Sequence, residues 1–214
     1  MNNAHAQTKK LNIAVLLYDG LSVSDFTGPV DVFVKANRLT NEYYNVYTFS
    51  MNRAFAHGQE NRLVYQPDYT VETMPKPDVL LIPGGTEGRM VTLSKDEAFI
   101  QMVKSTAAKA KVLMPVCTGA FIAAAAGLLN GRRTTTHYLV ADSLQKEYPA
   151  VHVVRNVRYV VDDNLISASG VTCGYDAALY LVQRYSGGPK AAQTANMMQY
   201  KPQEKERWPA GKRK

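Results

Sequence analysis

Short runs of apolar residues alternate with longer amphipathic segments along most of the chain. Uninterrupted apolar runs of strand length occur at residues 12–18 (NIAVLLY), 78–83 (DVLLIP) and 111–116 (KVLMPV), which indicates strands buried on both faces. Residues 44–50 (YNVYTFS) alternate in the manner of a half-exposed strand. Four shorter β runs are expected further along the chain, at residues 133–136, 152–155, 157–161 and 165–169. Asp162, Asp163 and Asn164 separate the last two runs and are a hairpin signal.

Segments with helical spacing separate these strands. They predict six helices, at residues 25–39, 94–110, 118–129, 138–148, 171–185 and 189–200. Pro29 suits the first helical position, and Ser94 with Glu97 three residues later matches a capping box. Residues 53–74 are irregular, with room for a β-ribbon. Buried strands that alternate with helices predict an α/β fold with a mostly parallel central sheet.

The composition is that of a folded domain. With 214 residues, 46% of them apolar and 20% charged, the chain does not have the composition of a disordered protein. No apolar run reaches the roughly 18–20 residues of a membrane-spanning helix, so we expect no membrane contact. There is no linker, internal repeat or low-complexity segment. The sequence therefore predicts a single domain over residues 11–200, with polar basic tails at 1–10 and 201–214.

The formal net charge of +7 belongs mainly to these tails. Residues 1–10 contribute +2 and residues 201–214 contribute +4, which leaves +1 for the body of the chain. A basic tail is usually a solvated end, so we expect no nucleic-acid partner. The first ten residues lack the order of a signal peptide, and we therefore expect a cytoplasmic protein.

Cys117 is the strongest candidate for chemistry. It lies between a buried strand and a helix that begins with small residues (TGAFIAAAAG), the arrangement of a nucleophile elbow. The positive end of that helix is expected to favour the thiolate and to lower the pKa of the cysteine. The alternative is a small buried core cysteine. Neither Cys117 nor Cys173 has the spacing of a metal ligand, so we expect no metal site.

Three further candidates surround this position in the predicted sheet. Gly84 and Gly85 end the preceding buried strand, where the N–H groups of Gly85 and Thr118 would form an oxyanion hole, unless the glycines only make a turn. Asp25 follows the first strand and either moves a proton or caps the next helix. His137 fits a cysteine partner and a structural histidine equally well.

The remaining cysteine and histidines have weaker claims. Cys173 starts a helix without a long buried strand before it, and we expect it to be structural. Tyr175 and Asp176 in the same segment either reach the site or cap the helix. The other three histidines, His5, His57 and His152, receive no role.

Four segments together resemble a known superfamily. They are LSVSDFTGPVDVF, DVLLIPGG, PVCTGAFIAAAAGLLNGRRTTTHY and SASGVTCGYDAAL. The chain resembles the ThiJ/PfpI superfamily, also called class I glutamine amidotransferase-like proteins, over about residues 11–200, and within it the isocyanide hydratases and the related domains of some AraC-type regulators. This resemblance implies a flavodoxin-like three-layer sandwich with a nucleophile elbow, usually as a homodimer.

The resemblance also implies a reaction. Asp25 stands where protease-like and deglycase-like members carry a glutamate, which favours the hydratase branch. In that branch the catalytic set would be Asp25, Cys117 and Thr118. The substrate would be a small isocyanide, hydrated to an N-substituted formamide through a thioimidate on Cys117, without a metal or organic cofactor. Tyr138 and Cys173 depart from the hydratase pattern, so we expect a reshaped pocket.

Two other functions fit the same site. In the first, the protein is a sensor or regulatory domain in which Cys117 is oxidised, or a metabolite binds without turnover. In the second, it has a glyoxalase-like or deglycase-like activity, against which the missing glutamate counts.

Overall fold

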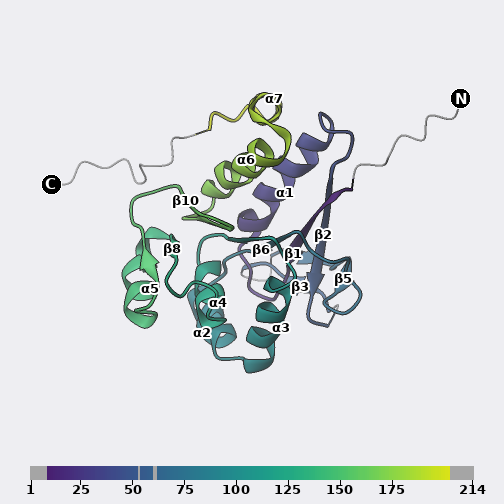
Figure 1. Ribbon diagram of the computed structural model, residues 1–214. Coiled ribbons are helices and arrows are strands. Elements are labelled where there is room, and N and C mark those ends of the chain that lie inside the picture. The colour runs from purple at the N-terminus through teal and green to yellow at the C-terminus, as the bar shows by residue number, and fades with distance from the viewer. Residues whose placement is uncertain (1–8, 53, 60–61, 203–214) are drawn as a thin grey trace, which may run out of the picture.

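Seven strands form the central sheet of the computed structural model, which describes residues 9–52, 54–59 and 62–202 (Figure 1). The strands are β1 (Leu11–Leu16), β2 (Tyr44–Ser50), β5 (Tyr69–Thr70), β6 (Val79–Ile82), β7 (Val112–Pro115), β10 (Tyr159–Asp162) and β11 (Leu165–Ala168). Their order across the sheet is β10-β11-β7-β6-β1-β2-β5. All neighbours pair in parallel except β10 and β11, which form the predicted antiparallel hairpin.

Helices cover both faces of this sheet (Figure 1). On one face lie α1 (Val23–Asn37), α6 (Cys173–Ser186) and α7 (Gly188–Met197), and on the other lie α2 (Glu87–Ser94), α3 (Glu97–Ala107) and α4 (Gly119–Ala125). A short 3-10 turn, Tyr138–Val140, leads into α5 (Ala141–Glu147) beside the second group. The predicted three-layer α/β sandwich is confirmed.

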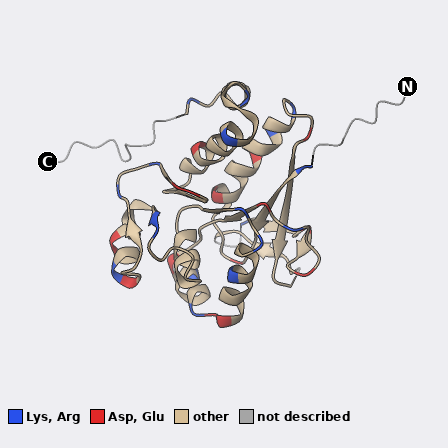
Figure 2. Ribbon diagram, in the orientation of Figure 1, with Lys and Arg blue, Asp and Glu red and all other residues tan. Residues whose placement is uncertain are grey.

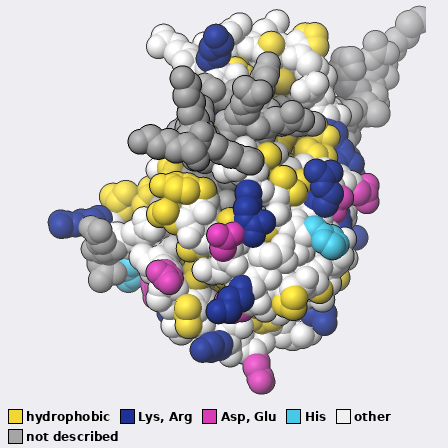
Figure 3. Space-filling model, turned by 90° about the vertical axis from the view of Figure 1, so that its left-hand side faces the viewer, with side chains coloured by type: hydrophobic (Ala, Val, Ile, Leu, Met, Phe, Trp, Pro, Cys, Tyr) yellow, Lys and Arg dark blue, Asp and Glu magenta, His cyan; other side chains and the backbone are white. Residues whose placement is uncertain are grey.

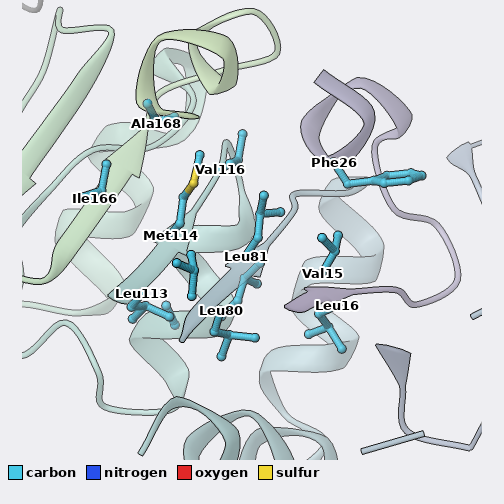
Figure 4. Packing of buried hydrophobic residues seen from close by; sticks show 14 of the residues in the cluster. Val15, Leu16, Phe26, Leu80, Leu81, Leu113, Met114, Val116, Ile166 and Ala168 are labelled. Carbon is cyan, nitrogen blue, oxygen red and sulfur yellow. The ribbon is translucent and has the colours of Figure 1, made fainter. Parts of the chain in front are cut away.

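Burial on both faces explains why the central strands are apolar without interruption. Every residue of β6 and β7 is buried. Figure 4 shows Leu81 and Met114 pointing to one side of the sheet and Leu80 and Leu113 to the other. Full burial of such a side chain contributes about 1.5–3 kcal/mol, so these strands anchor the fold at its centre.

Two small β-ribbons lie outside the central sheet. β3 (Ala56–His57) pairs antiparallel with β4 (Val64–Tyr65), which confirms the ribbon expected in this region. β8 (Arg133–Thr134) pairs in parallel with β9 (His152–Val153). The first ribbon is tied to the loop after β1, because Gly20 N–H donates to the His57 carbonyl at 2.7 Å and Gln59 N–H donates to that of Leu21 at 3.0 Å.

Two expectations about helix starts are wrong. The helix expected from Ser94 begins at Glu97 as α3, and its cap is Asp96, whose carboxylate accepts from Phe99 N–H at 3.0 Å. Ser94 is the last residue of α2, a helix that the sequence did not predict. A carboxylate one residue before the helix reaches the free N–H groups that Ser94 cannot. Pro29 lies inside α1 and not at its first position, because the helix already begins at Val23.

A buried ion pair joins α6 to Arg158, the residue directly before β10. Arg158 Nε donates to Asp176 Oδ2 at 2.5 Å, and both side chains are almost fully buried. Tyr200 Oη donates to the same carboxylate at 3.0 Å, and its ring stacks on Tyr175 with centroids 5.3 Å apart. A buried charge needs such partners, so Asp176 is part of the structural framework of α6.

Charges of both signs are dispersed over the described part of the chain (Figure 2). On the face that Figure 3 draws, basic and acidic side chains are interspersed. The predicted basic tails lie almost entirely outside the described residues. Among the helices that the structure describes, none is both long and apolar enough to span a bilayer.

Candidate active site

The carboxyl ends of three adjacent parallel strands meet at one edge of the sheet. Asp25 lies in the first turn of α1, which follows β1. Gly84 and Gly85 follow β6, and Cys117 follows β7. Since β1, β6 and β7 are neighbours in the sheet, these residues come together although up to 92 positions separate Asp25 from Cys117. Ligands bind at this edge in open parallel sheets.

Cys117 occupies a sharp turn with a left-handed backbone, at φ 57°. Its N–H donates to the Ala168 carbonyl at 2.9 Å, and its own carbonyl accepts from Thr136 Oγ1 at 2.9 Å. A non-glycine residue is uncommon in this conformation, and here hydrogen bonds on both sides of the residue hold it. The strand-to-helix elbow expected from the sequence is therefore present in the fold.

The first helical residue after the elbow must be glycine. A Cβ on Gly119 would lie 2.2 Å from the Ile82 carbonyl oxygen and 2.7 Å from that of Pro83, which are rigid backbone atoms at the end of β6. This contact brings α4 close to β6. It also sets the distance between the Cys117 turn and the Gly84 turn.

Asp25 is fully buried beside the cysteine. Its Oδ2 accepts from Gly84 N–H at 3.2 Å, and the side chains of Cys117 and Ser22 hydrogen-bond to the carboxyl. Burial raises the pKa of Asp25 to about 6, although these three hydrogen bonds pull it down. A carboxyl with that pKa takes and returns a proton near neutral pH.

The pKa of Cys117 moves opposite to the sequence expectation. Burial raises it, the negative charge of Asp25 raises it further, and the Thr118 N–H lowers it only in part. The helix dipole alone suggested a thiolate, but two effects on the pKa oppose it. The Asp25 carboxyl is adjacent, and the cysteine is only 8% exposed. The resting cysteine is therefore a thiol hydrogen-bonded to the Asp25 carboxylate.

The two glycines and Thr118 form a continuous hydrogen-bonded turn. Gly85 N–H donates to Thr118 Oγ1 at 2.9 Å, and that hydroxyl donates to the Gly85 carbonyl at 3.0 Å. A Cβ on Gly84 would come within 2.7 Å of Asp25 Oδ2 and 2.6 Å of Thr118 Oγ1. The Gly85 N–H thus holds the Thr118 side chain in place. The sulfur of Cys117 accepts a hydrogen bond from the Thr118 N–H.

The other sequence candidates, His137, Cys173 and Tyr175, make contacts with other neighbours. The ring of His137 packs against Tyr138, with centroids 4.9 Å apart, and lies beside Gly170. Its pKa is lowered by burial. Cys173 accepts a hydrogen bond from Ser169 at 3.3 Å in the first turn of α6. A Cβ on Gly28 would lie 2.9 Å from the Tyr175 ring, so Tyr175 packs on α1 one turn beyond Asp25.

Three residues near the site were not predicted from the sequence. Ser22 hydrogen-bonds to the Asp25 carboxyl. Thr136 supports the elbow carbonyl from 19 positions away. Tyr18 is buried, donates to the Pro83 carbonyl at 2.5 Å, and has a pKa raised by burial and by the negative charge of Asp25. In the sequence, only the proximity of Thr136 to the candidate His137 indicated that one of these three residues lies near the site.

Within the described residues, no group of three or more His, Cys, Asp or Glu side chains is arranged to hold a metal ion. The chemistry this arrangement offers is a thiol, a buried carboxyl that exchanges protons, and a backbone N–H aimed at the sulfur.

Known proteins resemble both the sequence and the fold. The isonitrile hydratase of Pseudomonas putida is 33% identical over 193 residues, which cover 90% of this chain and 79% of that protein. The HTH-type transcriptional regulator CdhR of Pseudomonas aeruginosa is 29% identical over 84% of this chain, which spans only 52% of the regulator. A ThiJ/PfpI family protein from Pseudomonas syringae superposes with a TM-score of 0.80 at 30% identity, over 91% of this chain and 77% of that one.

A more distant structure has the same fold. Drosophila melanogaster DJ-1beta superposes with a TM-score of 0.75 at 19% identity, over 90% of this chain and 99% of that one. The sequence profile of the DJ-1/PfpI family matches residues 11–184, a range that contains every site residue described above. The chain belongs to the DJ-1/PfpI family.

Proposed function

We propose that the protein is a cysteine-dependent isocyanide hydratase that converts an isocyanide and water into an N-substituted formamide. The observation that carries this proposal is the direct hydrogen bond between the buried Cys117 thiol and the Asp25 carboxyl, whose pKa is about 6. The similarity to isonitrile hydratase over 90% of the chain supports it.

In the first half of the reaction, the thiol adds to the terminal carbon of R–N≡C. Asp25 takes the thiol proton while the sulfur forms the C–S bond, and it then gives this proton to the same carbon. The product is the thioimidate R–N=CH–S on Cys117. Because the resting cysteine is a thiol, a base in contact with it is required, and Asp25 is the carboxyl in that position.

In the second half, water displaces the sulfur. The oxygen of the water attacks the thioimidate carbon while Asp25 takes one of its protons and passes that proton to the nitrogen. The C–S bond then breaks, the remaining hydroxyl proton passes to the sulfur through Asp25, and R–NH–CHO leaves. The Thr118 N–H stabilises charge on the sulfur in both halves.

The decisive experiment follows formamide production from a panel of isocyanides. Wild type should turn over at least one compound, Cys117→Ala should be inactive, and Asp25→Asn should lose about 100-fold or more, as expected for a lost acid–base group. Cys173→Ala is the matched control and should retain activity. Rapid quenching and mass spectrometry should show Cys117 heavier by the full mass of the isocyanide. Full activity in Cys117→Ala would refute the mechanism.

A second candidate function is a ligand-binding or redox-sensing domain without turnover. Similarity to HTH-type regulators over 84% of the chain favours it. The raised pKa of Cys117 counts against the redox form, because a thiol oxidises less readily than a thiolate. Selective oxidation of Cys117 by peroxide, with no formamide from any isocyanide, would support the sensor.

The family resemblance also implies a homodimer, and we propose that assembly for this chain in the cytoplasm, with a small molecule as its substrate. Light scattering on the purified protein measures the first of these directly.

A further inference from the structure

We infer that the site accepts isocyanides whose substituent is apolar and neutral or positively charged, and that it discriminates against negatively charged ones. This inference rests on the proposed function for the identity of the reacting group. The selection by charge and shape comes from a separate feature, a pocket between α2, α4 and α5.

The pocket reaches Thr118, the residue that follows Cys117 in the chain. Thr118 forms part of its wall, and the backbone N–H of Thr118 hydrogen-bonds to the Cys117 sulfur. A substrate whose terminal carbon meets the sulfur can therefore extend its substituent past Thr118 into this space.

The wall is mostly apolar. Met90, Val91, Phe121 and Val140 contribute to it, and the volume is about 90 Å³. An apolar cavity of about 150 Å³ holds a benzene ring, so this smaller pocket has room for a short alkyl chain. A pocket of this kind gains affinity by burying carbon.

The charge at the rim has one sign. Glu87, in the first turn of α2, and Glu147, the last residue of α5, both line the pocket. The remaining polar side chains that line it, apart from Thr118, are Ser94 and Ser143, so no lysine or arginine lines it within the described part of the chain. Two carboxylates in a lining that contains no basic side chain attract a cationic substituent and repel an anionic one.

The test compares three isocyanides of equal length that end in a methyl, an ammonium or a carboxylate group. We expect kcat/KM for the carboxylate compound to be about tenfold or more below that for the other two. The double variant Glu87→Gln and Glu147→Gln should bring the three values to within about threefold of one another. Glu97→Gln, an exposed glutamate outside the pocket, is the matched control and should leave the order intact.

A second variant tests the location. Val140→Phe should fill the pocket, so that activity on the methyl-ended chain falls while activity on methyl isocyanide remains. Two results would overturn the inference. In one, the three isocyanides have equal kcat/KM values. In the other, their kcat/KM values differ in the same way in wild type and in the double variant.

The outcome in which no isocyanide reacts is distinguishable. Formamides with the same three end groups can be titrated calorimetrically into Cys117→Ala. The same order of affinities, abolished by the double Glu→Gln change, would retain the pocket assignment and reject the hydratase reaction. Equal affinities would reject both.

Discussion

Replacing Gly119 with alanine opposes two effects whose sizes can be compared. In a helix, alanine is favoured over glycine by at most about 1 kcal/mol. Against this gain, the new Cβ would lie 2.2 Å from the Ile82 carbonyl oxygen, whereas real Cβ contacts essentially never fall below 3.0 Å. Overpacking against atoms that cannot rotate away costs up to about 3 kcal/mol. We therefore expect Gly119→Ala to lower the free energy of unfolding by about 2 kcal/mol.

Gly88→Ala is the matched control, because Gly88 is also helical and a Cβ there meets nothing within 4 Å. For a domain of this size, 1 kcal/mol corresponds to about 2–4 °C in Tm. Gly119→Ala should melt about 4–8 °C below wild type and Gly88→Ala about 2–4 °C above it. Urea unfolding followed by circular dichroism gives the free energies. A Gly119→Ala protein as stable as wild type would show that the tight approach of α4 to β6 is not what fixes the elbow.

The buried carboxyl links stability to pH, because the pKa of Asp25 is about 6 in the fold and 3.8 for an unperturbed group. The contribution of Asp25 to the free energy of unfolding is therefore fully present below pH 3.8 and is lost as pH rises through 6. Between pH 4 and 7 this loss amounts to up to about 3 kcal/mol, and the unfolding free energy of Asp25→Asn should lack it; parallel pH profiles for the two proteins would contradict the assignment. The proposed mechanism needs the ionised Asp25 carboxyl, so kcat/KM should rise with pH through about 6 in wild type. Thr136→Val removes the hydrogen bond to the Cys117 carbonyl and should cost about 1–2 kcal/mol in urea unfolding together with much of the activity, whereas Thr136→Ser should restore both. Arg158→Met leaves Asp176 buried without its charged partner and should cost about 3–5 kcal/mol, and adding Asp176→Leu should recover most of that stability; a double variant as unstable as Arg158→Met would show that packing, not charge, is at stake.

The parts of the fold that follow from local chemistry were predictable. The apolar runs at 78–83 and 111–116 became β6 and β7, because a strand buried on both faces has no polar positions. The elbow at Cys117 followed from a strand, a cysteine and a small-residue helix in succession.

The rest depends on contacts between distant segments. The start of α3 is set by the hydrogen bond from Phe99 N–H to the Asp96 carboxylate. In this polar stretch, Ser94 offered an equally good local signal for a helix cap. The raised pKa of Cys117 required knowing that Asp25 is buried against it, and no spacing along the chain reveals that burial. The sequence could therefore locate the candidate nucleophile, Cys117, but not its protonation state.

The meeting of three strand ends at one edge also governs when the site comes into being during folding. Asp25, Gly84 and Cys117 are brought together only by the parallel pairing of β1 with β6 and of β6 with β7. Such pairings close long loops and form slowly, because chain entropy is lost before the contacts are made. No partly assembled sheet holds all three groups in place. The rate at which activity recovers after denaturation should therefore report the slower of the β1–β6 and β6–β7 pairings. This recovery should lag behind the recovery of the helical circular dichroism signal.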